Sequence, residues 1–240
     1  MTSNVKKDGK VVRAPAKPRG KRTAKAVAGR KPKNTAVGTR SRDREVVEAA
    51  VRIFWEKGYS AASVQDVADA LGMLKGSLYY YIDSKESLLH RIFDDSHTEI
   101  VAITEESMQS DQPAVERLRR FLHDYAMWTL THLERAGLYS REWRYASESH
   151  RVTLAEHQRY YVQHLRELIT VGQREGSCDS GVEPRSASLF ILAAFTGLPD
   201  WYRPGNRQKA EDVAETYVGI AMRAVGADAI LQSGATELLG

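Results

Sequence analysis

Apolar residues recur at helical spacing along most of the chain, beginning near Arg42. In the first helical stretch they stand three and four residues apart from Val46 to Phe54, and Gly58 is placed to end the helix. No stretch alternates apolar and polar residues for long enough to build a sheet. The pattern therefore predicts an all-α fold.

A second and a third short helix are expected before residue 83. Ser63 begins the second helix, and Asp66 follows three residues later, as in a capping box. Gly72 then permits a left-handed turn. Leu78 and Ile82 are spaced to anchor the third helix in a small core.

From Ser84 onward the chain is predicted to remain helical. Pro199 should kink or end one of the later helices early, and Gly137 is expected to separate two others. The predicted helices cover residues 84–103, 113–136, 138–147, 150–175, 184–202 and 207–226.

Residues 2–40 differ from the rest in composition and contain no large apolar residue except Val. The first 40 residues hold 13 Lys and Arg against the single acid Asp8, a balance of +12; because the whole chain carries +4, the other 200 residues carry −8. Such a segment buries too little to offset its ordering entropy, so residues 1–40 are predicted to be a disordered basic tail. A basic arm beside an acidic body indicates a polyanionic partner.

Two segments of this tail, Lys17–Arg22 and Gly29–Lys33, resemble AT-hook cores, in which an extended Arg-Gly pair lies in a narrow A·T minor groove. Neither has the full Arg-Gly-Arg-Pro motif. The alternative is a solvated basic tail that adds salt-sensitive, sequence-independent affinity for DNA.

Catalysis and metal binding have no support in the sequence, which lacks HExxH, CxxC, P-loop and GxSxG motifs. His150, His157 and His164 repeat every seven residues, so neighbours lie ~10 Å apart along a helix. That is too far to share a metal, whose bonds to His are ~2 Å. We expect no catalytic residue, no metal and no cofactor.

The single Cys178 and the absence of an apolar run of ~18 residues indicate a reduced cytoplasmic protein, nucleoid-associated, without a membrane partner.

The stretch from Ser63 to Ile82 has the layout of a helix-turn-helix, in which a compact second helix enters the DNA major groove. The small side chains of Gly76 and Ser77 allow the backbone to approach DNA closely. Lys75 and the Ser77 hydroxyl can donate to phosphates or base edges. A Tyr-rich helical bundle without DNA binding is the alternative reading.

The tyrosines of this stretch should differ in role, because adjacent helical residues point in different directions. One of Tyr79 and Tyr80 can donate its hydroxyl to a phosphate while the other lies against base edges, and Tyr81 is expected to brace the domain. Lys85 stands in the first turn of the next helix, where a cation opposes the helix dipole; a phosphate contact would explain it.

Residues 42–100 closely resemble the DNA-binding domain of TetR-type transcriptional repressors. The resemblance runs through FWEKGYSAASV (Phe54–Val64), DVADALG (Asp66–Gly72) and KGSLYYYIDSKESLL (Lys75–Leu89); Tyr81-Ile82 departs from the more usual His-Phe, which affects packing. It implies a ligand-responsive repressor that binds a palindromic double-stranded DNA operator as a homodimer. The DNA contacts that it implies come from Arg40, Arg42, Ser63, Gln65, Lys75, Gly76, Ser77, Tyr79, Tyr80 and Lys85.

The resemblance also implies a C-terminal domain that holds an effector pocket and dimerises through its last two long helices, here 184–202 and 207–226. Ala187–Leu198 supports this, because it is apolar on nearly all sides and too hydrophobic for a surface helix. Burial inside one protomer is the alternative. The domains expected are 1–40 for the tail, 41–100 for DNA binding, 101–228 for ligand binding and dimerisation, and 229–240 for a flexible C-terminus.

Aromatic residues on the central helices suit a cavity for an apolar ligand with some polar groups, and arginines among them could hold an anionic group. Each residue taken singly could equally be a core aromatic or a solvated Arg. The predicted ligand-binding residues are Trp128, Tyr139, Trp143, Arg144 and Tyr161.

WYRPG (Trp201–Gly205) is similar to the C-terminal region of TetR-type repressors that control lipid and steroid-ring breakdown and answer to acyl-CoA thioesters. This resemblance implies an acyl-CoA effector. The alternatives are a repressor of a drug-efflux or other catabolic operon that senses another hydrophobic ligand, and an architectural DNA-binding protein that senses nothing. Deletion of residues 1–40 would abolish DNA binding by an architectural protein but leave a repressor its operator specificity.

Overall fold

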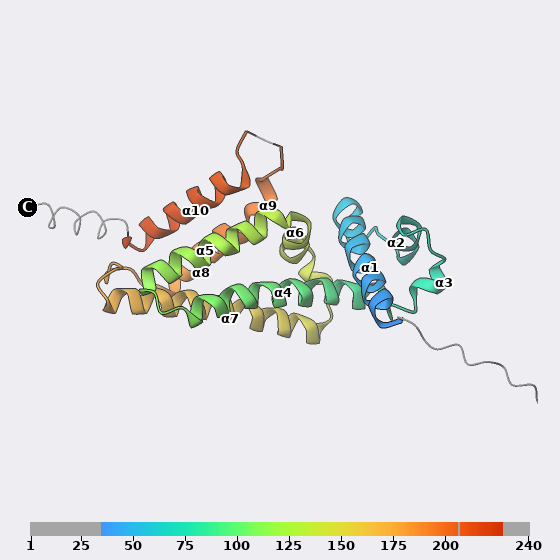
Figure 1. Cartoon of the computed structure of the whole chain (residues 1–240), viewed down its shortest axis with the longest axis horizontal. Helices are drawn as coiled ribbons and strands as arrows, with labels where there is room; N and C mark the ends of the chain where they lie inside the picture. The colour runs from blue at the N-terminus through green and yellow to red at the C-terminus, as the bar shows by residue number, and fades with distance from the viewer. Residues whose placement is uncertain (1–34, 206, 228–240) are drawn as a thin grey trace, which may run out of the picture. The chain divides into compact units, whose positions relative to one another are not determined.

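The computed structural model describes residues 35–205 and 207–227, with side chains from residue 41 onward. These residues form only helices and loops, which confirms the all-α prediction. The AT-hook-like segments and residues 229–240 lie outside the described residues. The helices, shown in Figure 1, are α1 (Thr35–Lys57), α2 (Val64–Ala70), α3 (Lys75–Leu78), α4 (Lys85–Gln109), α5 (Ala114–Thr131), α6 (Leu133–Glu142), the 3-10 helix η1 (Trp143–Tyr145), α7 (Glu148–Arg174), α8 (Pro184–Thr196), α9 (Leu198–Trp201) and α10 (Ala210–Ala224).

The first helix begins earlier than its apolar pattern predicted. α1 starts at Thr35 rather than Arg42, so the predicted disordered tail is wrong for its last six residues. The sequence has no apolar period there, but a helix that has already nucleated extends at the low cost of one residue for each hydrogen bond. Gly58, with φ of +77°, ends α1 as expected.

The break between α5 and α6 also lies elsewhere than predicted. The helix ends at Thr131, and His132 leaves helical geometry with φ −122° and ψ 43°. Gly137, which we expected to separate the helices, is buried inside α6, where a Cβ would come within 2.2 Å of the Trp55 ring of α1. This glycine therefore provides space for a packed tryptophan and is not a helix breaker.

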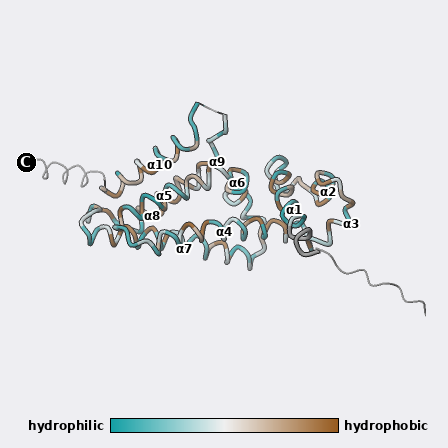
Figure 2. The backbone as a smooth tube through the Cα atoms, viewed as in Figure 1, coloured by the Kyte–Doolittle hydropathy of each residue, from teal (hydrophilic) through white to brown (hydrophobic). Residues whose placement is uncertain are grey.

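Two hydrophobic cores organise the helices. One joins α1–α3 to the first turns of α4 and includes Phe54, Leu78 and Phe93. The other is built from α5, α7, α8 and α10 and centres on Phe121, Leu165 and Phe195. α4 contributes to both cores, and in Figure 2 hydrophobic and hydrophilic residues alternate along the helices, as amphipathic packing requires.

The later helices follow the sequence pattern closely. Pro199 lies in the first turn of α9, after a break at Gly197, as its ring predicted. α5 packs against α4, α7 and α10, and α7 packs against α8. None of the described helices is both long and apolar enough to cross a membrane.

Candidate nucleic-acid interface and ligand pocket

The predicted capping box at the start of α2 is present. The Ser63 hydroxyl oxygen accepts the backbone N–H of Asp66, and the Asp66 carboxylate accepts the backbone N–H of Ser63 at 2.7 Å. Lys57, at the end of α1, donates to the same carboxylate at 2.6 Å, and the two partners lower the pKa of Asp66 to about 2. Gly72 then turns the chain with φ of +61°. These contacts fix α2 and the turn that precedes α3.

α3 is short and exposes most of the residues predicted to meet DNA. Leu78 is fully buried and anchors it, while Lys75 and Gly76 face solvent. Tyr79 is 47% exposed and Tyr80 is 88% exposed. The helix ends at Leu78, so both tyrosines follow the last helical turn rather than lying within a longer helix.

Gly76 is not required by the protein itself. Its φ is not positive, and a Cβ built there would meet nothing within 4 Å. Glycine costs roughly 1 kcal/mol relative to alanine within a helix. No contact among the described residues therefore accounts for a glycine at this position.

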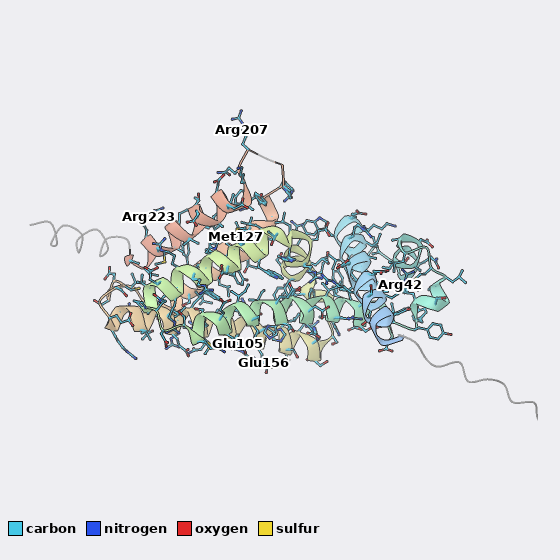
Figure 3. The ribbon with its side chains drawn as sticks, viewed as in Figure 1. Arg42, Glu105, Met127, Glu156, Arg207 and Arg223 are labelled. Atoms are coloured by element: carbon cyan, nitrogen blue, oxygen red, sulfur yellow. The ribbon has the colours of Figure 1, made fainter. Side chains whose placement is uncertain are left out.

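Several predicted contact residues are already engaged within the protein. The Ser63 hydroxyl donates to Asp66 at 2.7 Å, and the Gln65 amide donates to Asp69 at 2.7 Å. Arg42, labelled in Figure 3, pairs with Glu45 at 2.6 Å. The side chain of Arg40 lies outside the described residues.

Lys85 has an internal role that its sequence position did not reveal. Its ammonium lies 4.2 Å from the centre of the Tyr59 ring and donates to the Ser60 carbonyl at 3.4 Å. Burial lowers the pKa of Lys85. These contacts give Lys85 a role within the protein at the start of α4.

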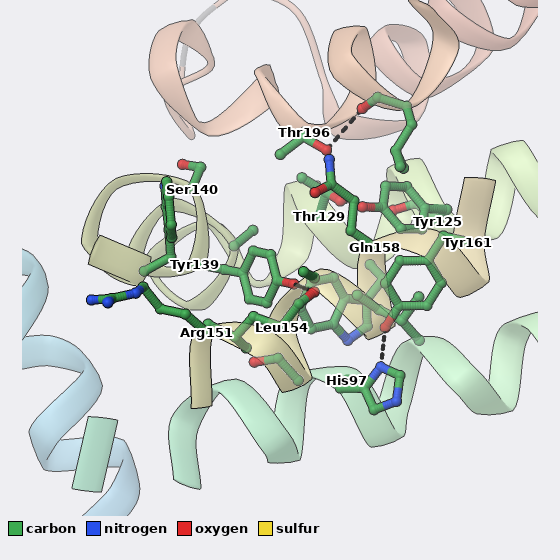
Figure 4. Close-up of a pocket in the computed structure, with 17 residues that line it drawn as sticks. His97, Tyr125, Thr129, Tyr139, Ser140, Arg151, Leu154, Gln158, Tyr161 and Thr196 are labelled. Atoms are coloured by element: carbon green, nitrogen blue, oxygen red, sulfur yellow. Dashed lines mark hydrogen bonds between the residues drawn. The ribbon is translucent and has the colours of Figure 1, made fainter. Parts of the chain in front are cut away.

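A pocket of about 380 Å³ opens among α4, α5, α6, α7 and α8 (Figure 4). Four of the five predicted ligand-binding residues line it: Trp128, Tyr139, Trp143 and Tyr161. Arg144 does not. Its guanidinium donates to the Arg141 carbonyl, and Arg151 of α7 supplies the cationic side chain of the lining instead.

Three residues of α4 also line the pocket and were missed by the sequence pattern: Ser96, His97 and Ile100. The Tyr161 hydroxyl and Nδ1 of His97 share a hydrogen bond, drawn as a dashed line in Figure 4. Burial lowers the pKa of His97 to about 4 and raises that of Tyr161, so both groups are neutral at pH 7. The pocket is therefore mainly apolar, with neutral polar groups on the α4 side.

Two histidines of the seven-residue repeat, His150 and His157, have a structural explanation. His90 and His97 of α4 stack on His150 and His157 of α7, with ring centroids 3.8 and 3.3 Å apart. Burial lowers the pKa of His150 and of His157. Within the described part of the chain no three His, Cys, Asp or Glu side chains are grouped so as to hold a metal ion. The stacks pack α4 against α7.

Both segments of the chain that carry these sites match models of known protein families. Residues 46–92 match the model of "Bacterial regulatory proteins, tetR family", and residues 111–225 match that of the "Tetracyclin repressor-like, C-terminal domain". The chain belongs to the TetR family. This is a family of DNA-binding transcriptional regulators and not of enzymes.

Individual relatives support the assignment over most of the chain. The chain is 29% identical to the transcriptional repressor KstR2 of Rhodococcus jostii over 199 residues. This aligned region covers 80% of the chain and 94% of that protein. The structure of the ketosteroid transcriptional regulator KstR2 of Mycobacterium tuberculosis superposes with a TM-score of 0.72 at 25% identity, over 77% of this chain and 94% of that one. The fatty acid metabolism regulator protein of Bacillus subtilis is 24% identical over 151 residues, 63% of this chain and 78% of that protein.

Proposed function

We propose that this TetR-family regulator is an effector-responsive repressor, acting in the cytoplasm on operator DNA of the nucleoid. The observation that carries the proposal is the position of α4. Its first turns bury Leu88 and Leu89 in the core shared with α1–α3, and its middle turns place His97 and Ile100 in the pocket wall. A ligand that shifts α4 would therefore act on the helix that supports the DNA-binding helices.

The chemistry of the pocket favours a lipid-derived effector, and we propose an acyl-CoA thioester. Its volume lies within the ~300–1,000 Å³ range of small-molecule sites. The apolar lining suits an acyl chain or ring system. Arg151 and the half-exposed Trp143, both in the lining, could meet a charged, aromatic head group. The names of the KstR2 and fatty acid relatives agree with this class of ligand.

Thermal unfolding with a series of acyl-CoA thioesters, from isovaleryl-CoA to palmitoyl-CoA, tests the proposal. A ligand at 100 times its Kd stabilises the folded state by ~2.7 kcal/mol, which is a Tm rise of about 5–10 °C for a chain of this size. The same ligand should weaken DNA binding about 5- to 150-fold.

A matched pair of variants separates pocket binding from surface binding. Ala155→Trp places a large side chain on an exposed residue of the pocket lining, and it should remove both effects. Ala102→Trp, on an exposed part of α4 outside the lining, should leave them intact. Equal stabilisation of both variants would place the ligand elsewhere, and no shift with any thioester would exclude this effector class.

The second half of the proposal is a homodimer through α8, α9 and α10. Leu189 and Phe190 of α8, Trp201 of α9 and Ile220 of α10 are large apolar side chains left exposed, and Phe190 is 62% exposed. Trp201 stacks on Tyr217 of α10 and donates to its hydroxyl at 3.1 Å, which connects α9 with α10. An exposed apolar surface of this kind marks a protein interface. Two-fold symmetry would also match the half-sites of a palindromic operator.

Phe190→Glu should convert the dimer to a monomer, because it places a charge in an interface that must lose its water. Light scattering coupled to size exclusion should give a mass that falls from twice the chain mass of 26.9 kDa to that mass itself. Val152→Glu, on an exposed position of α7 away from this surface, is the control and should remain dimeric. A monomeric wild type at micromolar concentration would refute the proposed interface.

A further inference from the structure

Leu74, the residue immediately before α3, is 80% exposed. No other Leu, Ile, Val or Met side chain in the described part of the chain is so exposed. Its backbone is held by hydrogen bonds, since its carbonyl accepts the N–H groups of Ser77 and Leu78 at 2.9 and 3.2 Å. A leucine side chain that is 80% exposed on a hydrogen-bonded backbone requires an explanation.

The fold does not provide one. The residue before a helix is usually Ser, Thr, Asn or Asp, because those side chains accept a free N–H of the first turn. Leu74 makes no such bond. An apolar staple against Leu78 would come from the preceding residue, Met73, and not from Leu74. At this position leucine thus gives up a cap bond and gains no packing.

We propose that Leu74 is a specificity-determining residue, which reads a thymine by contact with its C5-methyl group in the major groove. The methyl of thymine is the one apolar substituent on the major-groove edges of unmodified base pairs, where the N and O atoms are hydrogen-bonding groups that an alkyl chain cannot satisfy. The residues at the start of a recognition helix are those that contact base edges.

The neighbours of Leu74 agree with this contact. Lys75 beside it is exposed. A Cβ at Gly76 would point into open space, and because glycine has none, the backbone of residues 74–76 can come close to a base pair. Leu74 directly precedes these two residues and is exposed as they are. The inference requires that the chain binds DNA through α3, as its family does, but it does not depend on the effector or the dimer.

Uracil substitution tests the contact one methyl group at a time. Selection from a random DNA pool first gives the preferred site of the wild type. Each thymine of a synthetic half-site is then replaced by deoxyuridine, which removes only the methyl group, and Kd is measured by fluorescence anisotropy. At one position the wild type should bind about fourfold more weakly, the change that ~0.8 kcal/mol per buried methyl-sized group gives.

Leu74→Ser is the decisive variant, since it restores a favoured helix cap and should fold normally. It should bind thymine and deoxyuridine at that position equally well, and its selected sites should lose the thymine preference there alone. Met108→Ser, at an exposed residue near the end of α4, should behave as the wild type. The wild-type protein should also bind a DNA site with 5-methylcytosine at that position more tightly than the same site with cytosine.

Two results would overturn the inference: a thymine preference that Leu74→Ser retains, or a loss of affinity in that variant that is equal for all sequences. A wild type that binds no DNA sequence would refute the proposed function itself. A wild type that binds DNA without discriminating any thymine from deoxyuridine would refute only the role of Leu74.

Discussion

Tyr80→Ala should lower affinity for the selected DNA site about 5- to 150-fold, the effect of losing the 1–3 kcal/mol that a good base contact supplies. At 88% exposed, Tyr80 is the most exposed of the large apolar and aromatic side chains in the described residues. Removing its ring should therefore leave Tm almost unchanged, because surface substitutions usually cost less than ~0.5 kcal/mol. Anisotropy titrations and thermal unfolding of the same samples measure both quantities.

The phenylalanine variants separate two roles for the tyrosines at the end of α3. Tyr80→Phe and Tyr79→Phe each remove only a hydroxyl. A variant that loses affinity equally on all sequences and shows a reduced salt dependence has lost a phosphate contact. If a variant keeps its affinity, that tyrosine contacts the bases through its ring. Met108→Ala is the matched control. Unchanged affinity in both Tyr79→Ala and Tyr80→Ala would show that neither tyrosine contacts DNA.

Local signals in the sequence located the DNA-binding helices, although not the start of α1 or the end of α3, which stops at Leu78 before the predicted anchor Ile82. The Ser63–Asp66 pair, Gly58 and Gly72 each have a conformational or capping role that depends only on near neighbours, and the structure confirms all three. The burial of Leu78 follows from the same helical period. The resemblance to TetR-type repressors runs through this same segment, so its helices and the DNA-binding class could both be predicted from the amino-acid sequence.

Features that depend on distant contacts could not be predicted in the same way. Arg144 and Arg151 are alike in sequence, and only the course of η1 and α7 decides that Arg151 lines the pocket. The His90–His150 stack joins residues 60 positions apart, so a repeat within one helix did not reveal its partner. The engagement of Lys85 with Tyr59 was hidden for the same reason.

Gly137 shows how such a contact reverses the meaning of a residue. By helix propensity alone, glycine destabilises a helix, and alanine in its place should stabilise the helix by about 1 kcal/mol. In the structure, however, a Cβ at this position would lie 2.2 Å from Cζ3 of Trp55, whose ring also lies beneath the Arg141 guanidinium at 4.6 Å. The helix that carries Gly137 contributes Ala136, Tyr139 and Ser140 to the pocket, so α6 lies between the pocket and α1.

Gly137→Ala should therefore destabilise the protein by about 1–3 kcal/mol, the usual cost of overpacking a filled core, which lowers Tm by several degrees. Gly219→Ala in α10, where the nearest atoms are those of the Arg223 side chain at 3.5 Å, should be neutral or stabilising. In a Trp55→Leu background the Gly137→Ala change should become neutral or favourable, because the clash and not the helix determines its sign. A double-mutant cycle by thermal unfolding measures this coupling. A cost for Gly137→Ala that persists without Trp55 would show that the glycine is needed for another reason.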